Sequence, residues 1–231
     1  MRLLISSLLA ISASFVALHA EKAAHKPATE GAQLGQWTQD WDAAVNLAAE
    51  KNKAILVNFT GSDWCGWCKL MDKKVFAEEQ WVDYAKENLL LVTIDFPRDK
   101  SIVPKKYKER NEKLKNQFGV RGFPTYILLD QDGETKVGKL GASREATPKN
   151  FIQQVEEVLR FTASGIAKFT EGMPEEKVEE YKGLLAAHKA AEKKLMDWLD
   201  TRPQRTEENT KKFHAFQEDI TSAKAKIKSF Q

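Results

Sequence analysis

The sequence predicts an α/β protein with a helical extension at its C-terminus. Residues 54–59 and 89–94 are continuous apolar runs of strand length, and their lack of alternation is typical of strands buried on both faces of a sheet. Segments with helical periodicity precede, separate and follow these two runs. After Gly165 the composition becomes rich in lysine and glutamate, which indicates a separate helical region.

Residues 1–20 have the pattern of a secretory signal peptide. Arg2 precedes an apolar stretch interrupted only by serines, and Ala20 is the expected last residue removed. An uncleaved membrane anchor is the alternative, although the stretch is shorter than the roughly 20 apolar residues of a spanning helix. In either case we expect the remainder outside the cytoplasm, in the periplasm or secreted, where disulfides persist.

A disordered leader and then a folded domain are expected after the signal. Residues 21–36 carry Pro27 and small polar residues, which favour disorder. The domain is expected to span residues 37–164. Its first helix is predicted over residues 37–51, where apolar residues recur at roughly helical spacing and Asp40 can cap the helix.

The remaining elements of the domain follow from the same periodicities. Helices are predicted at residues 66–75, 78–86, 105–118 and 148–161, the last of which starts at Pro148. Two further strands are predicted at residues 126–129 and 135–140. The Asp132-Gly133 pair between them supplies the positive φ that a tight hairpin turn needs.

The C-terminal extension, residues 165–231, is predicted to be an antiparallel helical hairpin. Residues 174–199 and 206–230 have helical patterns, and Pro203 breaks the chain between them. Both helices carry aromatic residues. These aromatic residues either pack on the chain's own domain or engage a partner, which includes a second copy in a homodimer.

Composition excludes nucleic acid as an expected partner. The chain has 231 residues, 42% of them hydrophobic, which is enough for one domain of ordinary size plus an extension. Its 36 basic and 33 acidic residues give a formal charge of +3, and no basic run is long enough to indicate nucleic-acid binding.

Cys65 and Cys68 are the only cysteines of the chain, and they form a Cys-Gly-Trp-Cys motif directly after a predicted strand. A disulfide between them closes so short a loop that chain entropy would contribute roughly 2 kcal/mol, so structural stapling explains the pair poorly. Two thiols that reach each other easily suit reversible electron transfer. One attacks a substrate disulfide, and the second resolves the mixed disulfide.

Two other interpretations of this pair are open. A zinc site would need two further Cys or His ligands at workable spacing, and the four histidines lie far from Cys65 along the chain. The two thiols could also be ordinary buried side chains. We expect no metal and no cofactor other than a redox-active Cys65–Cys68 disulfide.

The chain resembles the thioredoxin superfamily over about residues 37–161. The resemblance rests on the strand followed by Cys-x-x-Cys at a helix start, and on Gly122-Phe123-Pro124-Thr125 entering a later strand. More narrowly, residues 59–68 with Met71 and Val75-Phe76 resemble secreted bacterial thioredoxin-like proteins, relatives of the C-terminal domain of periplasmic thiol-disulfide interchange reductases. The resemblance implies a central mixed sheet flanked by helices.

The resemblance also implies the roles of the site residues. Cys65 is the expected nucleophile, since a helix N-terminus stabilises a thiolate, and Cys68 is the expected resolving thiol. Pro124 is expected to be cis, with the Phe123 carbonyl and the Thr125 N–H free to pair with an extended substrate. The expected substrate-binding residues are Trp64, Gly66, Trp67, Phe123, Pro124 and Thr125.

The sequence departs from thioredoxin at two positions near the dithiol. Trp67 replaces a proline between the two cysteines. Because residues at this place influence the reduction potential, the sequence does not fix the potential or the direction of transfer. Asn58 stands where thioredoxin has a buried aspartate, so the proton relay to the second cysteine is absent or carried by another group. Asp63 and Lys69 flank the cysteines and could tune them or serve only as solvated surface residues.

These observations predict an extracytoplasmic thiol-disulfide oxidoreductase that reduces or exchanges protein disulfides. Its substrates would be protein thiols and disulfides, and its electron donor a membrane protein. The alternative function is a chaperone-like or partner-binding module of thioredoxin fold whose C-terminal helices mediate association.

Overall fold

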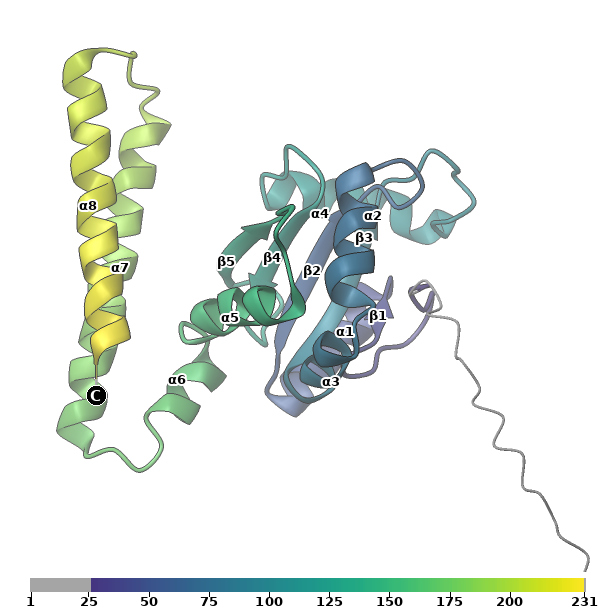
Figure 1. Ribbon diagram of the computed structural model, residues 1–231, viewed down its shortest axis with the longest axis horizontal. Helices are drawn as coiled ribbons and strands as arrows, with labels where there is room; N and C mark the ends of the chain where they lie inside the picture. Colours follow the sequence, from purple (N-terminus) through teal and green to yellow (C-terminus); the bar gives the residue numbers. More distant parts are fainter. Residues whose placement is uncertain (1–25, 231) are drawn as a thin grey trace, which may run out of the picture.

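A five-stranded mixed sheet lies at the centre of the computed structural model, which describes residues 26–230 (Figure 1). The strand order is β1-β3-β2-β4-β5. The strands are β1 (Trp37–Thr38), β2 (Ala54–Thr60), β3 (Leu89–Asp95), β4 (Thr125–Leu129) and β5 (Lys136–Gly141). The first three are parallel, whereas β4 is antiparallel to β2 and β5 is antiparallel to β4. The predicted mixed sheet is therefore confirmed.

The two central strands are buried along their whole length, as their continuous apolar runs predict. All seven residues of β2 pair in register with β3, from Ala54 opposite Leu89 to Thr60 opposite Asp95. Alternate side chains enter two separate hydrophobic cores, one on each face of the sheet. Helices must therefore cover both faces.

Four helical segments cover one face and two helices cover the other. Helix α2 (Gly66–Met71), a π-helical turn η1 (Asp72–Phe76), α3 (Glu79–Asn88) and α5 (Pro148–Leu159) contribute to the core that contains Leu56. Helices α1 (Trp41–Lys51) and α4 (Lys105–Gln117) contribute to the core that contains Val57. The sheet is thus the middle layer of three.

The prediction that residues 21–36 form a disordered leader is wrong for the part that the structure describes, residues 26–36. Residues 28–36 lie against the domain, because the N–H of Ala28 donates to the carbonyl of Trp37 at 2.9 Å and that of Gly35 to Leu89 at 3.0 Å. The hydroxyl of Tyr107 donates to the carbonyl of Thr29 at 2.7 Å. This segment covers the edge of the sheet, which would otherwise expose unpaired backbone groups. The expected signal peptide lies outside the described residues.

The first helix begins four residues later than predicted. Trp37 and Thr38 form the edge strand β1, and Trp37 is buried against Phe76 with ring centroids 5.3 Å apart. Asp40 is the N-cap, as predicted, and its carboxylate accepts the N–H of Ala43 at 3.2 Å. The aromatic packing of Trp37 therefore overrides the helical periodicity.

The helix predicted over residues 66–75 is divided in two. It is α-helical to Met71 and then widens into the π-helical turn, in which the N–H of Ala77 reaches the carbonyl of Asp72 at 2.8 Å. The turn ends at Phe76, which lies at the centre of an aromatic cluster. Its ring centroid lies 5.2–5.4 Å from those of Trp37, Trp81, Tyr126 and Phe151.

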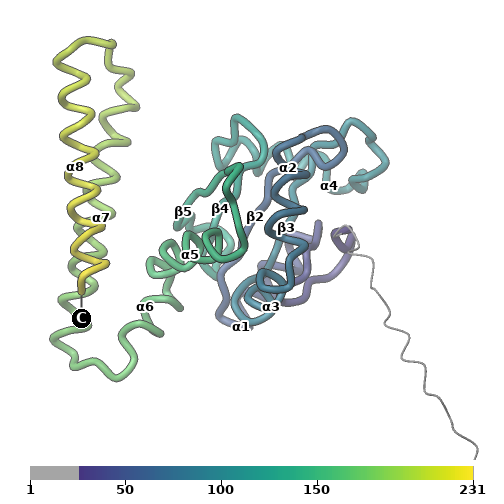
Figure 2. Tube along the Cα trace, viewed as in Figure 1, coloured from purple at the N-terminus to yellow at the C-terminus, as the bar shows by residue number. Residues whose placement is uncertain are grey.

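The C-terminal extension consists of a short helix and the predicted antiparallel hairpin. Helix α6 (Ala163–Phe169) was not predicted and spans the expected domain boundary, and the hairpin is formed by α7 (Glu175–Asp200) and α8 (Glu207–Ser229). Figures 1 and 2 show the hairpin standing beside the domain, with α6 as the link between them. Among residues 26–230, no helix is both long and apolar enough to cross a bilayer.

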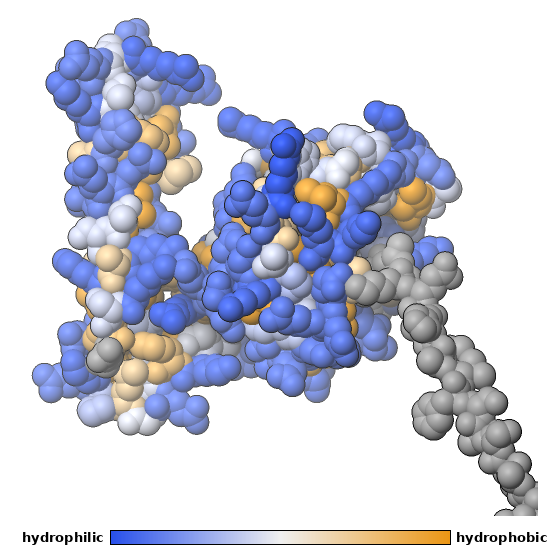
Figure 3. Space-filling view, viewed as in Figure 1, coloured by the Kyte–Doolittle hydropathy of each residue, from blue (hydrophilic) through white to orange (hydrophobic). Residues whose placement is uncertain are grey.

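The hairpin packs on preceding segments at its base and as far as the middle of α7, where His188 packs on Phe161 with ring centroids 5.0 Å apart. Tyr181 and Phe230 pack on Phe169 of α6, and Lys224 and Lys228 form ion pairs with Glu157 of α5. Further along, Trp198 of α7 packs on Phe216 of α8, with ring centroids 5.6 Å apart. Most of the visible hairpin surface is hydrophilic, with apolar patches along it (Figure 3). The aromatic residues are thus divided between α6 and the hairpin's own seam.

Phe76→Ala is expected to lower the free energy of unfolding by about 3–5 kcal/mol, because it removes the central ring of a buried aromatic cluster. Urea titration followed by far-UV circular dichroism measures the change. Ile102→Ala, at a residue that is 37% exposed, is the control and should cost less than about 1 kcal/mol. Equal losses in the two variants would contradict the central role of Phe76.

Candidate active site

The Cys-Gly-Trp-Cys motif, residues 65–68, lies where the chain leaves the central strand β2 and enters helix α2. Cys65 is the N-cap of α2, and its Sγ accepts the backbone N–H of Cys68 at 3.1 Å. The N–H of Cys65 in turn donates to the carbonyl of Gly61 at 2.8 Å, which closes the loop after the strand. The doubly buried strand therefore fixes the position of the helix N-terminus, where anionic sulfur is stabilised.

Cys65 and Cys68 form a disulfide, with their Cα atoms 5.2 Å apart. Both residues are buried, Cys68 almost completely. The pair can thus close and open within one turn of helix. Residues 26–230 contain no group of three or more His, Cys, Asp or Glu residues arranged to hold a metal ion.

Two exposed tryptophans belong to the same segment, since Trp64 precedes Cys65 and Trp67 precedes Cys68. Trp64 and Trp67 are 39% and 42% exposed, which is unusual for such large apolar side chains. The indole N–H of Trp64 donates to the carbonyl of Phe96 at 2.8 Å, so this ring is held in place. The guanidinium of Arg144 lies 5.5 Å from the ring centroid of Trp67. The tryptophans give the site an apolar surface that can contact another protein.

The second predicted motif lies beside the first. The Phe123–Pro124 peptide bond is cis, and the ring of Phe123 meets Trp64 edge-on at a centroid distance of 5.9 Å. Thr125 is buried at the start of β4, and its hydroxyl donates to the carbonyl of Gly122 at 2.8 Å. A Cβ atom added to Gly66 would meet no atom within 4 Å, so the space over this end of α2 is open. Segments almost 60 residues apart thus form one surface.

Residues 95–99 hold the loop before the cysteines in place. The sequence does not predict a role for this segment in the site. The N–H and hydroxyl of Ser62 both donate to the carboxylate of Asp95. The N–H groups of Arg98 and Asp99 donate to the carboxylate of Asp63 at 3.0 and 2.8 Å. The indole N–H of Trp64 also bonds to this segment, at Phe96. Ser62, Asp63 and Trp64 are therefore all hydrogen-bonded to residues 95–99.

Asp63 and Lys69 both hold this loop. The N–H of Asp99 is the main cause of the lowered pKa of the exposed Asp63 carboxyl. The ammonium group of Lys69 donates to the carbonyl of Asp63 at 2.7 Å. The side chains of Asp63 and Lys69 thus bond to backbone groups of nearby segments. These bonds position the loop that carries Trp64.

A buried carboxyl lies near the position where thioredoxin's aspartate is missing. Asn58 and Asp95 are both 5% exposed and lie on the same face of the sheet, on neighbouring strands. Both line a cavity of about 500 Å³, which also reaches Asp72, one helical turn after Cys68. Asn58 Oδ1 has no hydrogen-bond partner among the described residues.

Burial raises the pKa of Asp95, and the hydrogen bonds from Ser62 partly oppose this effect. The cavity therefore holds an ionisable group that Asn58 cannot provide. One sequence signal could have identified it, because Asp95 is a charged residue that directly ends a continuous apolar run.

Comparison with known proteins identifies similar domains. A family model described as a thioredoxin-like domain matches residues 41–158. Disulfide bond reductase DsbH of Chlamydia pneumoniae is 33% identical over 99 residues, which cover 43% of this chain and 58% of that protein. Thioredoxin-related protein DsbJ of the same organism is 25% identical over 114 residues, which cover 49% of this chain and 32% of that protein. The matches thus span about a third to little more than half of these relatives.

A solved structure has a similar fold. A chain described as DsbH oxidoreductase superposes with a TM-score of 0.50 and 27% sequence identity. The superposition covers 58% of this chain and 91% of that chain. The C-terminal hairpin lies outside the residues that the family model matches.

Asp95→Asn tests the buried carboxyl through the pH dependence of stability. Because the folded-state pKa of Asp95 is raised above 3.8, the unfolded chain releases this proton first as the pH rises. The stabilisation from this group is full below the ordinary aspartate pKa and is lost as the pH rises through the folded-state value. The free energy of unfolding of the variant, minus that of the parent, should therefore increase between pH 3.5 and pH 7.

Urea titrations at each pH measure this difference. Asp219→Asn, at an exposed position of α8, is the control and should show a nearly constant difference from the parent. A pH-independent difference for Asp95→Asn would mean that the carboxyl is solvated in the folded protein.

Proposed function

Because this chain belongs to the thioredoxin-like domain family, we propose that it is a thiol-disulfide oxidoreductase that acts through Cys65 and Cys68. One observation carries the proposal. The only two cysteines form a disulfide at a helix N-terminus, Trp64 and Trp67 in the same segment are exposed, and Phe123, which precedes a cis proline, packs on Trp64. A stapling role would explain none of these surroundings.

Reduction of a substrate disulfide proceeds in two exchanges. The Cys65 thiolate attacks one substrate sulfur, forms a mixed disulfide and releases the other substrate sulfur as a thiolate. The Cys68 thiolate then attacks Cys65 Sγ, which forms the Cys65–Cys68 bond and releases the second substrate thiolate. Two electrons pass to the substrate, and an external dithiol must return the pair to the reduced state.

The location of each sulfur supports this assignment of roles. Cys65 caps the helix, where unpaired N–H groups and the helix dipole stabilise its thiolate both as nucleophile and as leaving group. Cys68 lies one turn further along and is almost fully buried, so Cys65 is the sulfur that a bulky substrate reaches first. The short Cα separation of 5.2 Å allows Cys68 to resolve the mixed disulfide.

The surroundings of the disulfide suit an extended polypeptide as substrate. Trp64, Trp67 and Phe123 would contact its side chains, and the open space over Gly66 would admit its backbone. We expect this backbone to pair with the groups that flank Pro124, in Phe123 and Thr125. Protein thiols and disulfides are therefore the proposed substrates.

The proposed direction is reduction, and the proposed setting is the periplasm or the extracellular space. The name of the Chlamydia relative, disulfide bond reductase, supports reduction. The apolar N-terminal stretch supports export as a cleaved signal peptide. A reductase in this setting needs electrons from the cytoplasm, and we propose a membrane protein as the donor.

Substitution of the two cysteines separates their roles. Cys65→Ser is expected to abolish reduction of insulin disulfides, because no nucleophile remains. Cys68→Ser is expected to accumulate mixed disulfides, since attack still occurs and resolution does not. Turbidity measures insulin reduction, and mass spectrometry under non-reducing conditions measures the adducts.

The double variant is the control and should form no adduct. Full multiple-turnover activity of Cys68→Ser would show that the assigned roles are wrong.

A second candidate function, association through the hairpin, is supported by two exposed apolar side chains. Met196 and Leu199 are 56% and 38% exposed and lie three residues apart on α7, and so on one face. A homodimer that covers this face should lose mass on Leu199→Lys, measured by light scattering with size exclusion. Gln217→Lys on α8 is the matched control. A parent protein with the mass of a monomer would exclude the homodimer.

A further inference from the structure

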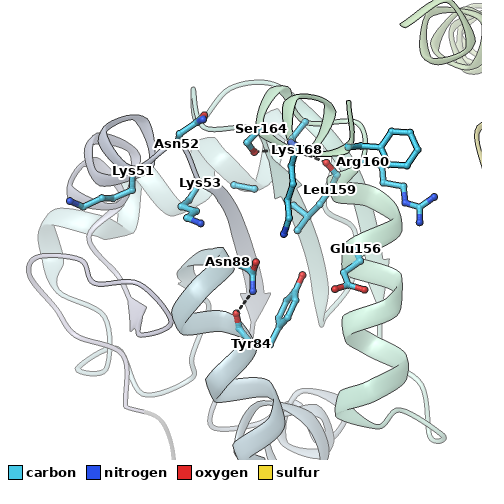
Figure 4. A pocket seen from close by; sticks show the side chains of 14 residues that line it. Lys51, Asn52, Lys53, Tyr84, Asn88, Glu156, Leu159, Arg160, Ser164 and Lys168 are labelled. Atoms are coloured by element: carbon cyan, nitrogen blue, oxygen red, sulfur yellow. Dashed lines mark hydrogen bonds between the residues drawn. The ribbon is translucent and has the colours of Figure 1, made fainter. Parts of the chain in front are cut away.

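A second cavity lies at the other end of β2 from the disulfide. It has a volume of about 640 Å³, which is in the range of small-molecule sites (Figure 4). Its walls include Lys53 and Ala54 at the start of β2, whereas Cys65 follows the end of that strand. A strand of this length spans about 20 Å, so the cavity is separate from the redox site.

The extension of this chain completes the cavity. The family model ends at residue 158, and the lining residues Arg160, Ser164 and Lys168 lie beyond it. Helix α6 lies close to the end of α5, since a Cβ atom at Gly165 would clash with the carbonyl oxygen of Leu159. This close approach places Lys168 at the cavity.

The lining is strongly basic. It includes four basic side chains and one acidic side chain: Lys51, Lys53, Arg160, Lys168 and Glu156. Within residues 26–230, Lys51 pairs with Glu50, whereas Lys53 and Lys168 form no ion pair. Figure 4 shows both of their side chains extending toward the space above Tyr84 and Asn88. Two cations that form no ion pair thus extend toward this space, and Glu156 is the one acidic side chain of the lining.

The floor offers an unused hydrogen-bond donor. The hydroxyl of Tyr84 points toward the two lysines (Figure 4), and it has no hydrogen-bond partner among the described residues. Asn88 supports the floor, since its side-chain amide donates to the carbonyl of Tyr84 at 2.7 Å. A buried hydroxyl without a partner is unfavourable, and a ligand oxygen would supply the acceptor.

We propose that this cavity binds a phosphate group, held between Lys53 and Lys168 and hydrogen-bonded to Tyr84. A phosphate monoester carries close to two negative charges at neutral pH, which match the two unpaired lysines. Its several oxygens can accept from both ammonium groups and from the phenol at once. The ligand is a free phosphorylated compound or the head group of a phospholipid.

Inorganic pyrophosphate is the probe for the free compound. Titration at low ionic strength, followed by the amide NMR signals of Ser164 and Gly165, should give saturable shifts. Lys53→Gln and Lys168→Gln should each weaken binding by roughly tenfold, and Tyr84→Phe should weaken it by about threefold. Lys149→Gln removes the same charge from an exposed position on α5 outside the cavity and should leave the affinity unchanged.

Vesicles test the lipid source. We expect co-sedimentation with phosphatidylcholine vesicles that contain phosphatidic acid, whose head group is a phosphate monoester, and none with phosphatidylcholine alone. Loss of this co-sedimentation in Lys53→Gln and Lys168→Gln would assign the site to a lipid head group. Saturable pyrophosphate binding with the same sensitivity would assign it to a free phosphate. Thermal unfolding without ligand shows that each variant is folded, independently of any redox activity.

Two results would overturn the proposal. One is the absence of binding to both pyrophosphate and the anionic vesicles. The other is an equal loss of affinity in Lys149→Gln and the cavity variants, which would show attraction to net charge only.

Discussion

The burial of β2 on both faces is the constraint on which the rest of the structure depends. Its side chains alternate between two cores, and a shift of one residue would exchange Leu56 and Val57 between them. The register of the strand is therefore fixed, and so are the two chain segments at its ends. One end carries the disulfide at the start of α2, and the other carries Lys53 at the basic cavity. The disulfide and the basic cavity are thus both attached to a strand whose position is fixed.

The loop between β2 and the cysteines is held by polar groups, because it leaves the hydrophobic cores behind. Asp95 ends the neighbouring strand β3 and accepts both donors of Ser62, while Asp63 accepts two backbone N–H groups in return. This reciprocal arrangement places Trp64 against Phe123, the residue before the cis proline. The position of Trp64 beside the disulfide is consequently held by acidic side chains that bond to neighbouring backbone and hydroxyl groups. A buried carboxyl at Asp95 is the cost of that arrangement.

Features encoded by local pattern could be predicted from the sequence, and features encoded by tertiary contacts could not. The doubly buried strands, the Asp40 cap and the helical hairpin follow from periodicity and capping chemistry within a few residues. The order of residues 28–36 depends on hydrogen bonds to Trp37, Leu89 and Tyr107, which polar composition does not reveal. Likewise, the bond between Ser62 and Asp95 joins residues 33 positions apart, and the π-helical turn is accompanied by the packing of Phe76 among four rings.

The short helix α6 contacts both the base of the hairpin and the basic cavity of the domain. Phe169 at its end packs on Tyr181 and Phe230, and so anchors the base of both hairpin helices. The same helix carries Lys168 at the basic cavity, and Glu157 of α5 pairs with two lysines of α8 nearby. An anion bound as proposed would therefore neutralise a charge on the helix that contacts the base of the hairpin. The disulfide lies at the other end of β2, about one strand length away, so the proposed anion site and the cysteines are attached to the domain at separate places.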